Sequence, residues 1–376
     1  MTLVSSGTPD KNETRDPDYR RIFDVTIADT LQSAVKMIRA DPVLLATGTR
    51  ILYRLKRSAA RRMRYERVGI LVPAIIIVSI TSRCNLACKG CYMRLHPPKA
   101  HREMSHVHLA SIVSQAAELG VAVMVIAGGE PLLRKQEIFD MARNFPDLLF
   151  LLFTNGLLID DETATAIAGL KNIVPVISFE GFEHETDVRR GTGVYGGLLV
   201  ACSRLRERKV FFGCSVTVDR ENFDRVTDEI FVQRMIDIGA RVFTYVEYVP
   251  IEPGTEGLVL SDDQRNALNA SLVKFTEKYP ALFIGFPGDE KAFGGCLAAG
   301  RGFVHISPAG DIEPCPAAPF SDANLITMPL KEALKSRVLR LIRNNHGALT
   351  ETQGGCALWT NREWVQTLLH EIDDEN

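Results

Sequence analysis

Three cysteines in the first third of the chain could hold a metal centre. Cys84, Cys88 and Cys91 have the spacing CxxxCxxC and come directly after an apolar segment that predicts a strand. Thiolates are soft ligands that suit iron–sulfur clusters, and three of them can bind a 4Fe-4S cluster while one iron has no protein ligand. A small chelating molecule could bind that iron. The alternative is a zinc site completed by His101 or His106, although zinc sites usually have paired CxxC or HxxxH spacings.

The segments around these cysteines predict parallel strands joined by helices. Short runs rich in Val, Ile and Phe alternate with amphipathic stretches long enough for crossover helices, such as 105–119 and 195–208. This alternation indicates an α/β fold, either an open doubly wound sheet or a closed or partial barrel. The six predicted strands are 75–80, 121–126, 148–153, 173–179, 211–216 and 241–248.

Polar motifs follow several of these strands, where parallel sheets place their reactive groups. Gly128, Gly129 and Glu130 follow the second strand. The glycines allow close backbone approach, and the carboxylate can accept hydrogen bonds from an ammonium group. At the end of the fourth strand, Ser178 and Glu180 have side chains that pair well with a sugar diol. The pattern therefore predicts one site formed by the carboxyl ends of several strands.

The cysteine run resembles a known family. Cys84 to Cys91, with Asn85 and Leu86 after the first cysteine and Tyr92 after the last, is similar to the radical S-adenosylmethionine (radical SAM) superfamily. The resemblance covers most of the chain from about residue 75 and implies a partial (β/α)6 TIM-like barrel. In that family S-adenosylmethionine chelates the open iron through its amine and carboxylate. One electron cleaves the sulfonium to a 5′-deoxyadenosyl radical, which abstracts a hydrogen atom from the substrate.

The motif after the second predicted strand supports this resemblance. It is similar to the family's GGEP motif, which binds the amino group of the cofactor, and it consists of Gly128, Gly129, Glu130 and Pro131. The family usually has an aromatic residue before the third cysteine, packed near the adenine, whereas this chain has Gly90. Tyr92 is the substitute that the sequence offers.

Two further segments resemble cofactor-binding parts of the family. Ser178 and Glu180 are similar to a Ser-x-Asp-Gly motif, with glutamate in place of the usual aspartate, which implies contacts with the ribose hydroxyls. Arg189 lies in a segment similar to an arginine-containing loop, which implies an ion pair with the cofactor carboxylate. A solvated basic turn is the alternative. Cys202 and Cys214 fall within a predicted helix and strand, so we expect buried apolar residues there rather than ligands.

A second set of cysteines lies near the end of the chain. Cys296 and Cys315 flank a predicted hairpin around 308–310, and Cys356 follows in a Gly-Gly-Cys segment. This arrangement resembles the start of SPASM or twitch domains, which carry auxiliary 4Fe-4S clusters, and three thiols allow one such cluster. Its remaining iron would be open or bound by His346, a backbone group or the substrate. A zinc site with His346 is the alternative.

The predicted organisation has four parts. They are a disordered polar tail (1–18), an N-terminal helical segment (19–70), the core barrel (71–250) and a small α+β domain of the SPASM/twitch type (251–376), with a helix that begins at Ser261. No secretory signal is recognisable, and the longest apolar run, 70–80, is too short to cross a bilayer. A cytoplasmic location is expected.

Charge and composition say little about the partner. The 44 basic and 46 acidic side chains nearly cancel, so nucleic acid is not favoured. The basic segment 50–67 could lie on an anionic membrane or pack as a solvated helix against the barrel. The resemblance implies a reductant such as ferredoxin or flavodoxin and a small-molecule, lipid or peptide substrate. The first two are favoured because 19–67 does not predict a compact leader-binding fold. Two alternatives to an enzyme stay open: a non-catalytic electron-transfer protein with two clusters, and a zinc-organised binding module.

Overall fold

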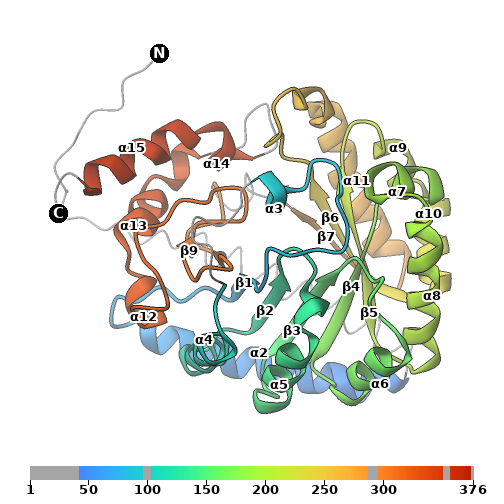
Figure 1. Ribbon diagram of the computed structural model, residues 1–376, viewed down its shortest axis with the longest axis horizontal. Coiled ribbons are helices and arrows are strands. Elements are labelled where there is room, and N and C mark those ends of the chain that lie inside the picture. The colour runs from blue at the N-terminus through green and yellow to red at the C-terminus, as the bar shows by residue number, and fades with distance from the viewer. Residues whose placement is uncertain (1–41, 96–102, 287–294, 350–355, 374–376) are drawn as a thin grey trace.

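The core of the protein is one mixed sheet of nine strands in the order β7-β6-β5-β4-β3-β2-β1-β8-β9 (Figure 1). This computed structural model describes residues 42–95, 103–286, 295–349 and 356–373. All neighbouring strands from β7 to β8 run parallel, and β9 is antiparallel to β8. The strands are β1 (Ile75–Ser79), β2 (Val123–Ala127), β3 (Leu149–Thr154), β4 (Ile173–Phe179), β5 (Phe212–Val218), β6 (Ala240–Glu247), β7 (Leu282–Phe286), β8 (Phe303–Ile306) and β9 (Ile312–Glu313).

Helices surround the sheet and cover its outer face, as parallel strands with crossover connections require (Figure 1). The α-helices are α2 (Pro42–Glu66), α3 (Tyr92–Leu95), α4 (His106–Leu119), α5 (Lys135–Asn144), α6 (Asp161–Gly169), α7 (Glu183–Arg190), α8 (Val194–Glu207), α9 (Phe223–Val226), α10 (Glu229–Ile238), α11 (Asp262–Lys278), α12 (Leu330–Ala333), α13 (Arg337–Asn344), α14 (Ala357–Thr360) and α15 (Arg362–Asp373). Short 3-10 helices lie at Pro131–Arg134, Glu256–Leu258 and His346–Ala348.

The six strands predicted from apolar runs are present as β1 to β6, and the two named helical patterns are α4 and α8. The half-barrel nevertheless has seven parallel strands from β1 to β7, because β7 pairs with β6. The helix before β7 begins as predicted. Ser261 caps α11, and its side chain accepts a hydrogen bond from the amide of Gln264. The pairing of β7 with β6 therefore gives the barrel one strand more than the six predicted.

The residues predicted to form a separate C-terminal domain continue the same sheet. β8 and β9 form the predicted hairpin, and β8 pairs in parallel with β1. In the part of the chain that the structure describes, strand pairing therefore crosses the boundary predicted at residue 251. The physical reason is that β6 and β1, at the two edges of the six predicted strands, offer unpaired backbone groups to later segments. A distinct SPASM/twitch domain stays a prediction.

Helix α2 packs near the amino ends of the strands. Arg62 donates a hydrogen bond to the carbonyl of Gly120 at 2.7 Å, and Arg54 and Arg57 each lie 3.5 Å from Asp147, which precedes β3. These contacts favour a helix packed against the barrel over one bound to a membrane. Among the described residues, no helix is long and apolar enough to span a bilayer. The predicted tail at 1–18 lies outside the described residues.

Alternation along the strands separates an outer face, under the helices, from an inner face. The ring of Phe179 on β4 packs edge-on against Tyr195 of α8, with centroids 5.9 Å apart, so the adjacent Ser178 faces inward. The register pairs Ser178 with Ser215, and Ser215 with Thr244. These three side chains form a polar row across the inner face of β4, β5 and β6.

Candidate functional site

The cysteine loop follows β1 at the carboxyl ends of the strands. Cys84 is exposed, Cys88 and Cys91 are half-buried, and all three are free thiols. The side-chain amide of Asn155, after β3, donates to the Cys84 sulfur at 3.8 Å and to Oδ1 of Asn85 at 2.7 Å. Burial raises the pKa of the Cys84 thiol, and the neighbouring Cys88 and Cys91 raise it further. The three sulfurs therefore lie within electrostatic range of one another.

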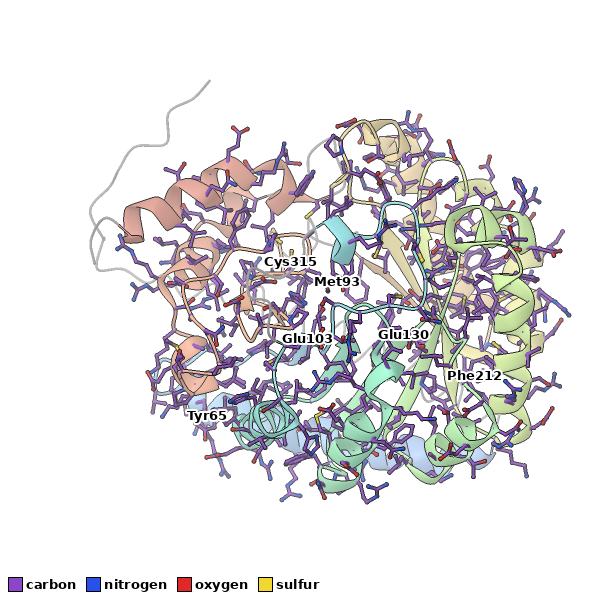
Figure 2. All side chains as sticks on the ribbon, viewed as in Figure 1. Tyr65, Met93, Glu103, Glu130, Phe212 and Cys315 are labelled. Atoms are coloured by element: carbon purple, nitrogen blue, oxygen red, sulfur yellow. The ribbon has the colours of Figure 1, made fainter. Side chains whose placement is uncertain are left out.

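Glu103 fixes the start of this loop (Figure 2). Its Oε1 accepts hydrogen bonds from the Thr81 hydroxyl at 2.8 Å, the Ser82 amide at 2.8 Å and the Ser82 hydroxyl at 3.0 Å. Burial raises the pKa of Glu103, but these hydrogen bonds oppose it and the net shift is downward. The carboxylate thus restrains the backbone that leads into Cys84.

The double-glycine turn after β2 packs directly against the cysteine loop. The amides of Gly129 and Glu130 donate to the carbonyls of Thr81 and Arg83 at 2.7 and 2.8 Å. A Cβ atom on Gly129 would lie 2.1 Å from the Arg83 carbonyl oxygen, and one on Gly128 would lie 2.4 Å from that of Thr81. Only glycine fits at either position, so the two loops meet backbone to backbone.

The side chain of Glu130 points into the protein and has no exposed surface (Figure 2). One carboxylate oxygen accepts from the Thr154 hydroxyl at 2.7 Å, and the other accepts from the Asn155 amide at 2.8 Å. Burial raises the pKa of the Glu130 carboxyl, although these hydrogen bonds oppose the shift. Pro131, beside it, is buried as well. Glu130 therefore ties the end of β2 to the end of β3, and the half-exposed part of the motif is the backbone of its glycines.

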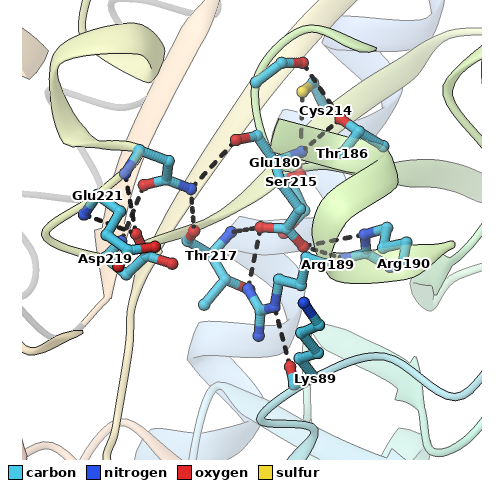
Figure 3. A network of polar contacts seen from close by, with 12 residues as sticks. Lys89, Glu180, Thr186, Arg189, Arg190, Cys214, Ser215, Thr217, Asp219 and Glu221 are labelled. Carbon is cyan, nitrogen blue, oxygen red and sulfur yellow. Dashed lines mark hydrogen bonds and ion pairs between the residues drawn. The ribbon is translucent and has the colours of Figure 1, made fainter. Parts of the chain in front are cut away.

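Glu180 is the centre of a buried ion-pair network (Figure 3). Its Oε2 accepts from Arg189 at 3.0 Å and from the Thr217 amide at 3.2 Å, and its Oε1 accepts from Nε of Arg190 at 2.9 Å. The side chain of Glu180 is 1% exposed. Both oxygens are thus bonded to protein groups. The network contains two residues, Glu180 and Arg189, for which the sequence implies cofactor contacts; those contacts stay predictions.

Helix α7 attaches this network to the cysteine loop. The amide of Lys89 donates to the carbonyl of Arg189 at 3.0 Å, and Nε of Arg189 donates back to the carbonyl of Lys89 at 3.2 Å. Burial raises the pKa of the Cys88 thiol, whereas the charges of Arg190 and Arg189 lower it. The two guanidinium groups therefore act electrostatically on the cysteine loop.

An aromatic ring lies against Gly90, but it comes from another part of the chain. A Cβ atom on Gly90 would lie 2.7 Å from the hydroxyl oxygen of Tyr248, the first residue after β6. Tyr248 is buried, and the guanidinium carbon of Arg189 is 5.9 Å from its ring centroid. The substitute that the sequence offers, Tyr92, interacts instead with Ser79 at the end of β1, and burial raises the pKa of Tyr92 to about 12.

The structure brings the second set of cysteines together. Cys296, Cys315 and Cys356 are buried free thiols. A hydrogen bond with Cys356 and burial raise the pKa of the Cys315 thiol, and Cys296 adds to the shift. His346, the predicted fourth ligand, donates from Nδ1 to the carbonyl of Arg343 at 2.6 Å. Cys315 thus lies within hydrogen-bonding reach of Cys356 and within electrostatic range of Cys296.

A buried chain of three side chains joins β1 to the C-terminal hairpin. Oγ of Ser79 lies 2.8 Å from Nε2 of His305, and Nδ1 of His305 lies 2.6 Å from Glu313. A carboxylate only accepts, so Nδ1 donates to Glu313, and in the neutral ring Nε2 accepts from Ser79. The register places His305 opposite both Ile77 and Glu313 on one face of the sheet. This chain connects the strand before the first cysteine set to the hairpin before Cys315.

Several residues that shape the site were not predicted from the sequence. They are Ser79, Glu103, Arg190, Tyr248, His305 and Glu313. Asn155 follows its strand as Glu130 follows the one before, so it lies at one of the strand ends where the sequence predicts reactive groups. No local pattern marks Glu103 or Tyr248, since their contacts join segments far apart in the chain. Arg190 was open to recognition only through its neighbour Arg189.

The cysteine loop has the donor set of an iron–sulfur cluster. Within the described ranges, no three His, Cys, Asp or Glu side chains lie close enough to enclose a single metal ion. The cysteines that hold a cubane bind separate irons, so their sulfurs lie farther apart than those of a zinc site. In a zinc site every sulfur bonds to the same ion, with a Zn–S distance of about 2.3 Å. Of the two histidines in the zinc alternative, His101 lies outside the described residues, and His106 is 3.6 Å from Glu137. Soft thiols beside N–H donors and arginines suit a 4Fe-4S cluster.

Comparison with known proteins matches part of the chain to a known superfamily. Residues 78–230 match the model of the radical SAM superfamily. The matched segment runs from the end of β1 to the start of α10, so this part of the half-barrel is similar to a radical SAM domain, and the chain is an enzyme. The relatives to which it is similar are likewise synthases and cyclases.

Two relatives and one solved structure show the extent of the likeness. The chain is 24% identical over 315 residues to AdoMet-dependent heme synthase of Methanosarcina barkeri, which covers 76% of this chain and 88% of the relative. It is 28% identical over 259 residues to PqqA peptide cyclase of Gluconobacter oxydans, with coverages of 65% and 71%. The structure of Streptococcus suis SuiB bound to S-adenosylmethionine has a similar fold, with a TM-score of 0.60, 18% identity, and coverages of 74% and 69%.

A methyl group at the loop junction should destabilise the protein. In Gly129→Ala the added carbon would overlap the Arg83 carbonyl, so we expect the free energy of unfolding in urea to fall by about 1–3 kcal/mol. Gly196→Ala in α8 is the matched control, because nothing lies within 4 Å of its added carbon. It should be neutral or slightly stabilising. Equal stability of the two variants would contradict the close contact.

The Glu103 carboxylate should protect the Ser82 amide from hydrogen exchange. Because the pKa of Glu103 is lowered on folding, its stabilisation is present above the pKa of the unfolded state and is lost as the pH falls through the folded pKa. We expect Glu103→Gln to reduce Ser82 protection at neutral pH and to match wild type well below the ordinary value of 4.5. Glu118→Gln, on the exposed side of α4, is the control. Unchanged protection at neutral pH in Glu103→Gln would refute the restraint.

Proposed function

We propose that the chain is a radical SAM iron–sulfur enzyme that cleaves S-adenosylmethionine reductively and abstracts a hydrogen atom from its substrate. The observation that carries this proposal is the loop of three free cysteines at the carboxyl edge of the half-barrel, packed against the double-glycine turn. In the proposal Cys84, Cys88 and Cys91 bind a 4Fe-4S cluster. When bound there, the cluster and the cofactor would supply the radical chemistry that removes a hydrogen atom from an unactivated C–H bond.

The chain's own groups would bind and orient the cofactor. The half-exposed backbone of Gly128 and Gly129 is suited to the amino group, and the inward hydroxyl of Ser178 to the ribose. Arg189 is the proposed partner of the carboxylate, and its five N–H donors are enough for a ligand as well as for Glu180. Since both oxygens of Glu180 are engaged, its contribution is to hold Arg189 rather than to bind the ribose.

The aromatic side chain that would stack on the adenine is the part of the cofactor site that differs from the family's pattern. Tyr92 and Tyr248 are its two candidates, one following the third cysteine and the other packed on Gly90. Aromatic rings bind purines by stacking, with a contribution of about 1–3 kcal/mol. The apolar inner face of β1 to β3 would keep water from the radical, since its residues are Ile75, Ile77, Val123, Val125, Leu149 and Leu151.

Cys296, Cys315 and Cys356 are the proposed ligands of an auxiliary 4Fe-4S cluster. Their convergence supports this assignment, and with three thiols one iron would stay open or take a further ligand. Such a cluster could accept an electron from a substrate radical. Ferredoxin or flavodoxin is the class of reductant that would supply the electron for cofactor cleavage.

The substrate class is proposed from the relatives. The names of the similar proteins refer to peptides, such as PqqA and the SuiA precursor, and to heme and coproporphyrin. A peptide or a porphyrin-like small molecule is therefore the proposed substrate. The names that refer to heme and coproporphyrin agree with the small molecule favoured from the sequence. A lipid substrate has no further support, because the basic part of α2 is packed on the barrel.

Cofactor cleavage should depend on the first cysteine set alone. The protein is reconstituted anaerobically with iron and sulfide, then given dithionite and S-adenosylmethionine, and 5′-deoxyadenosine is measured by mass. We expect product from wild type and none from the triple variant Cys84→Ala, Cys88→Ala, Cys91→Ala. A Cys202→Ala, Cys214→Ala variant, which removes two buried thiols outside the loop, should retain cleavage. Cleavage by the triple variant, or none by iron-loaded wild type in the presence of peptide and porphyrin candidates, would refute the proposal.

Iron content should separate the two cysteine sets. Wild type should bind about eight irons, as two cubane clusters require, and each triple-alanine variant should bind about four. The second variant replaces Cys296, Cys315 and Cys356. Iron and acid-labile sulfide, measured per chain after gel filtration, check this. Zinc in place of iron, or four irons in wild type, would contradict the auxiliary cluster.

A further inference from the structure

Arg190 is a buried cation whose position nothing in the proposed cofactor binding explains. Its side chain is only 12% exposed, and Nε donates to Oε1 of Glu180 at 2.9 Å (Figure 3). Glu180 has no freedom of its own, because Arg189 and the Thr217 amide bind its other oxygen. The guanidinium of Arg190 is therefore held at one place by a carboxylate that is itself fixed.

That place is beside the cysteine loop. The two reciprocal backbone and side-chain bonds between Lys89 and Arg189 join the last turn of α7 to the residue between Cys88 and Gly90. Burial lowers the pKa of the Arg190 guanidinium, but Glu180, Cys88 and Cys91 raise it by more, so the group stays cationic. Arg190 in turn lowers the pKa of the Cys88 thiol.

A fixed cation near an iron–sulfur cluster favours the state with one more electron. Reduction adds one negative charge to the cluster, and inside a protein this charge interacts more strongly with nearby groups than it would in water. Net charge and hydrogen bonds around a cluster are known determinants of its potential. A fixed anion such as Glu180 acts in the opposite sense.

We propose that Arg190, held by Glu180 and α7, raises the reduction potential of the 4Fe-4S cluster bound by Cys84, Cys88 and Cys91. This inference rests on the proposed function, because it presupposes that cluster. The step concerned is the transfer of one electron from an external reductant to the oxidised cluster, and no proton or bond changes in it. Arg190 would thus act only through its fixed positive charge, which makes reduction of the cluster more favourable.

The test is a redox titration of the reconstituted holoprotein with dithionite, followed by electron paramagnetic resonance. The signal of the first cluster is identified by its change when S-adenosylmethionine is added. Four variants are compared with wild type: Arg190→Met, Arg190→Lys, Glu180→Gln and Arg265→Met. Arg265 is the matched control, because it is 10% exposed, pairs with the buried Glu247 at 2.9 Å, and lies on the outer face between β6 and α11.

Two of the four variants should shift the potential, in opposite directions, and the other two should leave it close to wild type. Arg190→Met should make reduction at least about tenfold less favourable, which for a one-electron couple is about 59 mV toward more negative potential. Arg190→Lys keeps the charge and should stay close to wild type. Glu180→Gln should shift the potential to more positive values. Arg265→Met should leave the reduction potential unchanged even if it destabilises the fold. If the role of Arg190 were purely structural, Arg190→Met and Arg265→Met would affect the potential alike.

The outcomes distinguish this inference from the function on which it rests. An identical potential in wild type and Arg190→Met, or shifts of the same sign in Arg190→Met and Glu180→Gln, would overturn the role of Arg190 alone. If Arg190→Met does not fold, the comparison of Glu180→Gln and Arg190→Lys with wild type decides in the same way. Absence of any cluster signal from the first cysteine set in wild type would overturn the proposed function as well.

Discussion

The carboxyl edge of the half-barrel depends on one contact, in which the double-glycine turn after β2 meets the start of the cysteine loop. The bonds run between main-chain amides at 129 and 130 and main-chain carbonyls at 81 and 83, so they are independent of side-chain rotamers. Glu103 restrains the loop from one side, and Glu130 anchors the turn to the end of β3 from the other. An exposed loop thereby starts from a rigid base, which is a requirement for holding ligands in a fixed geometry.

Two buried carboxylates in the site are stabilised in different ways. Moving an ion out of water costs several kcal/mol, and either opposite charges or hydrogen bonds must compensate. Glu130 is bonded to neutral hydroxyl and amide donors, and its pKa is raised. Glu180 is bonded to two arginines and an amide. The first arrangement serves the architecture of the turn, whereas the second brings a pair of cations to the edge of the cysteine loop.

Much of this site could be predicted from the sequence, because its motifs follow strands whose apolar runs are clear. The strands from β1 to β6 and the meeting of Cys296, Cys315 and Cys356 were predicted from spacing and resemblance. The pairing of β7 with β6 and of β8 with β1 was not, since strand order depends on which free edge a later segment finds. The same reason explains Tyr248, which fills the space left by Gly90 from another strand. Glu180 shows a further limit, because a motif identifies a residue but not the partners that occupy its oxygens.

The parallel pairing of β1 with β8 has a consequence for how the chain reaches its fold. Ile75 pairs with Phe303, so one edge of the first strand stays open during synthesis until more than two hundred further residues have been made. Contacts this distant in sequence slow folding, and an unpaired apolar strand in the meantime is prone to associate with other chains. The cysteine loop leaves that same strand, and Ser79 completes its polar contacts only when His305 arrives. Completion of the sheet at the free edge of β1 is thus a late event in the folding of the half-barrel.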